Sequence, residues 1–96
     1  MSEIRVIRMR TYPDAEPTPS GRRYIARFDI EVAGIRIHRC HLVRNRHDGL
    51  DVYPPRMDPD IQPGGLHSVL FVKGARRAIR DAARREYELA MIERAA

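Results

Sequence analysis

Apolar and polar positions alternate through much of the first half of the chain. In one extended stretch, the apolar residues that share a face are Tyr24, Ala26, Phe28, Ile30 and Val32. Charged side chains fill the other face, which is the pattern of a half-buried antiparallel strand. Residues 4–10 and 35–43 combine β-branched and charged side chains in a similar way, and residues 50–53 form a short apolar run before two prolines. The pattern predicts four antiparallel strands.

Ala33 and Gly34 separate two of these strands by the two-residue spacing of a tight hairpin. Glycine at the second position can adopt a positive φ. The spacing predicts cross-strand pairs of matching character: Val32 with Ile35, Ile30 with Ile37, Glu31 with Arg36, and Asp29 with His38. Such agreement favours one register, because a slip of one residue would move every side chain to the other face.

The last part of the chain has the periodicity of an amphipathic helix. Its apolar face would be formed by Ala75, Ile79, Ala82, Ala83 and Ala90, with Tyr87 and Leu89 at the margins. This spacing predicts one helix over residues 75–94. An apolar run at residues 68–72 predicts a further strand, and the regions rich in proline and glycine at 12–21 and 54–66 predict loops.

Together these elements predict an α+β fold, in which an antiparallel sheet of four to five strands packs against one long C-terminal helix. We expect residues 1–96 to form a single domain, because 96 residues are too few for two. A chain of this length buries only about 60% of its unfolded surface, so we also expect a homodimer.

Composition narrows the class of protein further. Eighteen Lys and Arg against 13 Asp and Glu give a net charge of +5, and Cys40 has no second cysteine with which to form an intrachain disulfide. No apolar run approaches the roughly 18 residues that a membrane-spanning helix needs. We therefore expect a basic cytoplasmic protein with no membrane partner.

Basic residues follow one another along one side of the predicted helix. The residues with this spacing are Lys73, Arg77, Arg80 and Arg84, with Arg76 and Arg85 beside them. Guanidinium groups on a rigid helix can bind phosphate oxygens, and each neutralised phosphate releases counterions. The predicted nucleic-acid-binding residues are Lys73, Arg76, Arg77, Arg80, Arg84 and, from the preceding loop, Arg56. The alternative is a charged helix face that contacts only solvent.

His38, Cys40, His41 and His47 raise the question of a metal site, because imidazole and thiolate are zinc ligands. Regular alternation would put His38 and Cys40 on one face of a strand and His41 on the other, so these three residues could not converge without a bulge. We therefore expect His38 to pair with Asp29 and no metal to bind. The chain also has no recognisable catalytic motif, so neither an enzyme nor a cofactor is expected.

The order of these segments resembles that of the stage V sporulation protein G (SpoVG) family. The segments that carry the resemblance are residues 4–10, 28–31, 37–38, 49–55 (Gly-Leu-Asp-Val-Tyr-Pro-Pro), 79–82 (Ile-Arg-Asp-Ala) and 87–88 (Tyr-Glu). The resemblance implies a small α+β fold, a homodimer built through sheet pairing, and site-specific DNA binding together with RNA binding. It implies neither a cofactor nor a catalytic residue.

Several positions depart from the family pattern. Pro54 stands where the family commonly has Met, residues 56–72 lack the family's Phe-Arg-Asp-Ile phrase, and the loop at 12–21 is longer than usual. We therefore expect a divergent member that binds nucleic acid in a regulatory role. The alternative is a homodimeric protein-interaction adaptor that does not bind nucleic acid.

Overall fold

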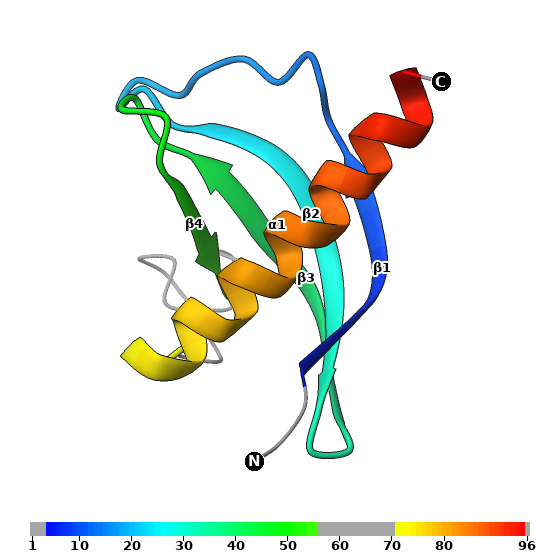
Figure 1. Cartoon of the computed structure of the whole chain (residues 1–96). Helices are drawn as coiled ribbons and strands as arrows, with labels where there is room; N and C mark the ends of the chain where they lie inside the picture. The colour runs from blue at the N-terminus through cyan, green and yellow to red at the C-terminus, as the bar shows by residue number, and fades with distance from the viewer. Residues whose placement is uncertain (1–3, 56–70, 96) are drawn as a thin grey trace, which may run out of the picture.

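The computed structural model describes residues 4–55 and 71–95 and confirms the α+β fold (Figure 1). The elements are β1 (Ile4–Thr11), β2 (Arg23–Val32), β3 (Ile35–Arg44), β4 (Leu50–Tyr53) and α1 (Lys73–Ala95). The four strands form one sheet in the order β1-β2-β3-β4, and each strand pairs antiparallel with the next. The strands and the helix all begin and end within two residues of their predicted bounds.

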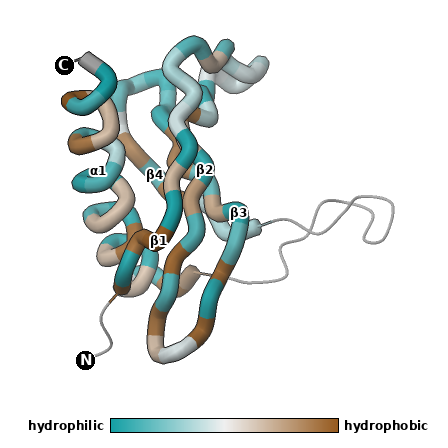
Figure 2. The backbone as a smooth tube through the Cα atoms, turned by 90° about the vertical axis from the view of Figure 1, so that its right-hand side faces the viewer, coloured by the Kyte–Doolittle hydropathy of each residue, from teal (hydrophilic) through white to brown (hydrophobic). Residues whose placement is uncertain are grey.

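The helix α1 crosses one face of the sheet diagonally, from β4 to β1 (Figures 1 and 2). The buried core between the two layers includes Phe28, Ile30, Cys40, Leu42 and Val52 from the sheet and Ile79 and Ala83 from α1. Alanines on the buried face of the helix bring its backbone close to the sheet. Within the described residues, no helix or strand covers the other face, which we call the outer face.

The β2–β3 hairpin has the predicted register. Val32 pairs with Ile35, Glu31 with Arg36, and Ile30 with Ile37. Both turn residues have positive φ, 52° at Ala33 and 78° at Gly34. This is the conformation of a type I′ turn, whose twist matches that of the strands on either side.

Residues 12–22 and the β3–β4 turn lie close together at one end of the sheet (Figure 1). Neither contains a strand or a helix, which confirms the predicted loop at 12–21. The side chain of Asn45 organises the turn: its Oδ1 accepts hydrogen bonds from the amides of His47 (2.8 Å) and Gly49 (2.9 Å). A Cβ atom at Gly21 would lie 3.0 Å from the Cβ of Arg46, so the two connections are in close contact.

The predicted face of Tyr24 is wrong. A β-bulge lies between Tyr24 and Ala26 in the pairing of β2 with β3. The extra residue, Ile25, is buried, and Tyr24 pairs with Val43 on the outer face. A bulge reverses the alternation that a regular strand would keep.

The predicted arrangement of His38, Cys40 and His41 is also wrong, because a second bulge interrupts β3. His38 and Arg39 together oppose Asp29, and Arg39 has a φ of 64°. Beyond this bulge, Cys40 pairs with Phe28 in the core, while His41 pairs with Arg27 on the outer face. Burial raises the pKa of the Cys40 thiol to about 12, with a further contribution from the charge of Asp29. The thiol therefore stays neutral.

Two other predictions fall partly or wholly outside the described residues. The strand expected at 68–72 is described only at Phe71 and Val72, which form no strand. The loop expected at 54–66 is described only at Pro54 and Pro55, so Arg56 lies outside. No helix in the described part of the chain is long and apolar enough to cross a membrane.

The positive φ of Ala33 generates a stability prediction. A left-handed conformation costs an ordinary L-residue about 1 kcal/mol, whereas asparagine adopts it readily. Ala33→Asn is expected to stabilise the protein by about 0.5 kcal/mol in urea unfolding, and the β-branched control Ala33→Val is expected to destabilise it. A loss of stability in Ala33→Asn would contradict the assignment of a type I′ turn.

Candidate nucleic-acid interface

The predicted basic residues of α1 have different surroundings. Lys73, Arg77 and Arg84 are exposed and form no ion pair with any described residue. Arg80 is partly exposed, with its Nε 3.8 Å from Oδ1 of the adjacent Asp81. Such a surface pair contributes little to stability and leaves the guanidinium open to solvent. Lys73, Arg77, Arg80 and Arg84 therefore lie along one flank of α1, as their spacing predicts.

Arg76 holds the start of α1 against β4. Its Nε lies 3.6 Å from Oδ1 of Asp51 and is buried without a hydrogen bond. Its guanidinium carbon lies 5.5 Å from the centre of the Tyr53 ring, in the range of a cation–π contact. Through these contacts the Arg76 side chain packs against the sheet, whereas the side chains of Lys73, Arg77 and Arg84 are exposed.

A second group of basic side chains lies on the outer face of the sheet. We call it the outer arginine cluster; its members are Arg8, Arg10, Arg27 and Arg39. All four are exposed, and they line an open hollow of about 670 Å³ together with Phe28, Asp29 and His38. None of the four guanidinium groups forms an ion pair with a described residue. Four like charges around one hollow attract an anion more strongly than the same charges spread along a helix.

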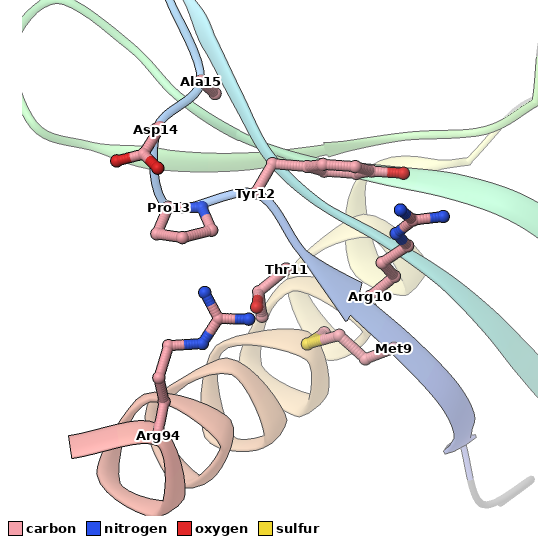
Figure 3. Close-up of a pocket in the computed structure, with 8 residues that line it drawn as sticks. All are labelled: Met9, Arg10, Thr11, Tyr12, Pro13, Asp14, Ala15 and Arg94. Atoms are coloured by element: carbon pink, nitrogen blue, oxygen red, sulfur yellow. The ribbon is translucent and has the colours of Figure 1, made fainter.

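Bulges in β1 and β3 bring the outer arginine cluster together. Val6 pairs with Ile30 but Arg8 pairs with Asp29, so Ile7 is the extra residue of β1. The side chains of Arg8 and Arg10 consequently lie on the outer face, with Arg10 opposite Arg27. Figure 3 shows Arg10 beside Tyr12, where its guanidinium carbon lies 5.5 Å from the ring centre.

Asp29 is the one carboxylate among the described residues that line this hollow. Its Oδ2 lies 3.0 Å from Nδ1 of His38, which confirms the predicted pair, and its Oδ1 accepts a hydrogen bond from the Arg39 amide at 3.0 Å. Burial opposes ionisation, but these hydrogen bonds and the charges of His38 and Arg8 outweigh it and lower the pKa of Asp29 below its ordinary 3.8. Four guanidinium groups against this one carboxylate leave the hollow with a net positive charge.

The outer arginine cluster is not among the residues that the sequence predicted to bind nucleic acid, although part of its arrangement could be read from the strand pattern. Alternation along β2 placed Arg27 on the face away from the core. The orientations of Arg8, Arg10 and Arg39 depend on bulges, which alternation cannot reveal. A clearer signal would have been the excess of arginine over acidic residues in the first three strands.

Comparisons with protein-family models, with curated proteins and with solved structures find no match to this chain.

The lowered pKa of Asp29 predicts a pH-dependent contribution to stability. A carboxyl group with a depressed pKa in the folded state stabilises it above the unfolded-state pKa, and this contribution is lost as the pH falls through the folded-state pKa. Asp29→Asn is therefore expected to lower the free energy of unfolding by about 1 kcal/mol near neutral pH. The difference from the wild type should shrink as the pH falls below 3.8, the ordinary pKa.

Urea unfolding of both proteins at about pH 7 and about pH 3 measures this difference. Glu31→Gln is the matched control, because the Glu31–Arg36 pair is more exposed and should contribute little at either pH. If the free energies of unfolding of the wild type and Asp29→Asn differ by the same amount at both pH values, the role given to the Asp29 charge is contradicted.

Proposed function

We propose that this chain is a divergent SpoVG-like protein that binds nucleic acid in a regulatory role and has no enzymatic activity. The single observation that carries the proposal is the outer arginine cluster, which gathers around one open hollow four guanidinium groups without an ion pair to any described residue. Phosphate groups suit such a cluster, because each is anionic and can accept two hydrogen bonds from one guanidinium.

The choice between the outer face and α1 follows from the distribution of charge. Carboxylates interrupt the basic residues of α1, where Asp81, Glu86 and Glu88 follow within the same few turns. The hollow on the outer face contains one carboxylate, which His38 and the Arg39 amide already hold. The outer arginine cluster is therefore the primary phosphate-binding surface in this proposal, and the flank of α1 is the alternative.

A comparison of two variants with equal reduction of charge tests this choice. The first, Arg8→Gln/Arg10→Gln/Arg27→Gln, reduces the outer arginine cluster and leaves Arg39, whose left-handed backbone disfavours most replacements. The second, Lys73→Gln/Arg77→Gln/Arg84→Gln, removes three charges from α1. Fluorescence anisotropy with a labelled random oligonucleotide at several salt concentrations measures both affinity and salt dependence.

The first variant is expected to bind at least tenfold more weakly. The slope of log K against log salt should become shallower by about 0.7 to 0.9 for each phosphate that the protein no longer neutralises. The second variant should change affinity much less. If the second variant instead loses much more affinity than the first, nucleic acid binds to α1 rather than to the outer face. Absence of wild-type binding would contradict the function itself and favour the adaptor alternative.

We also propose a homodimer, formed through the C-terminal part of α1. Leu89 and Ile92 lie three residues apart on α1 and are 54% and 65% exposed. Exposing two neighbouring large apolar side chains to water is unfavourable in so small a domain. The sheet edges are less suitable. Pairing β1 with a second β1 would bring rows of arginines together, and Pro54 directly follows β4. These features favour the helix over the sheet pairing that the family resemblance implies.

Leu89→Glu/Ile92→Glu is expected to convert the dimer to a folded monomer, since two carboxylates from each subunit would have to be buried in the interface. Sedimentation velocity measures the mass, and circular dichroism checks the fold. Glu88→Gln, which alters a neighbouring exposed position without adding charge, should remain dimeric. A wild-type protein that stays monomeric throughout the micromolar range would contradict the proposal.

A further inference from the structure

A second hollow adjoins the outer arginine cluster on the same face of the sheet. It has a volume of about 220 Å³, and its walls include the rings of Tyr24, His41 and Tyr53. We call these three residues the aromatic wall. His41 pairs with Tyr53 across β3 and β4, and Tyr24 reaches the same face because of the bulge at Ile25.

The two hollows share side chains. Arg27 and Arg39 line both of them, so the positively charged hollow and the aromatic wall form one continuous surface. A ligand that fills both must carry an anionic group and a planar apolar group a short distance apart. A nucleotide within a strand has this composition, with a phosphate on one side of the sugar and a base on the other.

The rings of the aromatic wall differ in how much of their surface other side chains of the protein already contact. The ring of Tyr53 has two cations near it, with the guanidinium carbons of Arg22 and Arg76 at 5.6 and 5.5 Å from its centre. Tyr24 contacts His41 at 5.4 Å between ring centres, with the two planes at 77°. A perpendicular contact covers at most one face of either ring. Tyr24 is also partly exposed, so it is the ring best placed to stack on a base.

We propose that the outer face binds single-stranded nucleic acid, with a phosphate in the outer arginine cluster and the neighbouring base against Tyr24. This inference rests on the proposed function and specifies its ligand. In a duplex the bases stack on one another and pair, so a duplex could offer phosphates to the arginines but no base to Tyr24. A single strand can use both hollows, because its bases are free to turn outward.

The test compares four labelled probes of equal length with the wild-type protein: an oligouridine RNA, an oligothymidine DNA, a DNA duplex, and an abasic DNA strand that carries phosphates without bases. Fluorescence anisotropy at one salt concentration gives the four affinities. The two base-containing single strands are expected to bind at least fivefold more tightly than the abasic strand and the duplex. Their order relative to each other shows whether RNA or DNA is preferred.

A variant of Tyr24 tests where the base binds. Tyr24→Leu should lower the affinity for the base-containing single strands roughly 5- to 100-fold and leave binding of the abasic strand unchanged. Its salt dependence should match that of the wild type, because the arginines that bind phosphate are all retained. Tyr24→Phe retains the ring and should retain the affinity. If Tyr24→Leu does not fold, the probe series with the wild-type protein still decides whether free bases contribute to binding, and overturns the inference if they do not.

The outcomes separate this inference from the proposed function. Binding of the abasic strand or the duplex as tightly as the single strands would overturn the inference and leave nucleic-acid binding in place. Failure of all four probes to bind would overturn both. If the wild type prefers single strands but Tyr24→Leu binds them with unchanged affinity, the base does not stack on Tyr24. That result would overturn the assignment of the aromatic wall as the base-binding site.

Discussion

Three β-bulges in the described strands determine which side chains of this small sheet face the core and which face outward. Each bulge adds one residue to a strand and reverses the alternation beyond it. In β1 the extra residue is Ile7, in β2 it is Ile25, and in β3 His38 and Arg39 together oppose a single residue. Without them, Arg8 and Arg10 would point at α1, where a buried unpaired charge costs several kcal/mol. The bulges thus keep the core apolar and gather the arginines outside it.

The two faces of the sheet differ in composition. The inner face and α1 form the core, in which Phe28, Ile30 and Leu42 are almost completely buried. The outer face carries the outer arginine cluster and the aromatic wall. Asp29 lines the hollow of the outer arginine cluster and accepts a hydrogen bond from the Arg39 amide in the bulge. Because the apolar core lies on the inner face, the outer face can carry an excess of positive charge, which favours an anionic ligand.

The strands and the helix could be predicted from the sequence because their signals are local. A two-residue turn and alternating side chains specified the hairpin register as far as Ile30 and Ile37, and helical periodicity specified α1. Prediction of the faces failed at Tyr24 and Cys40, since a bulge depends on pairing with another strand and leaves no local periodic signal. The same limit hid the outer arginine cluster, whereas the basic residues of α1 were evident from their spacing alone.

The most direct test of this account is an NMR titration of the isotopically labelled protein with an oligouridine strand. Amide chemical shifts follow each strand and the helix separately, without any mutation. The account predicts that the largest changes fall on Arg8, Arg27 and Arg39 and on Tyr24 and His41, while α1 changes little. Changes confined to α1, with the outer face of the sheet unaffected, would contradict it.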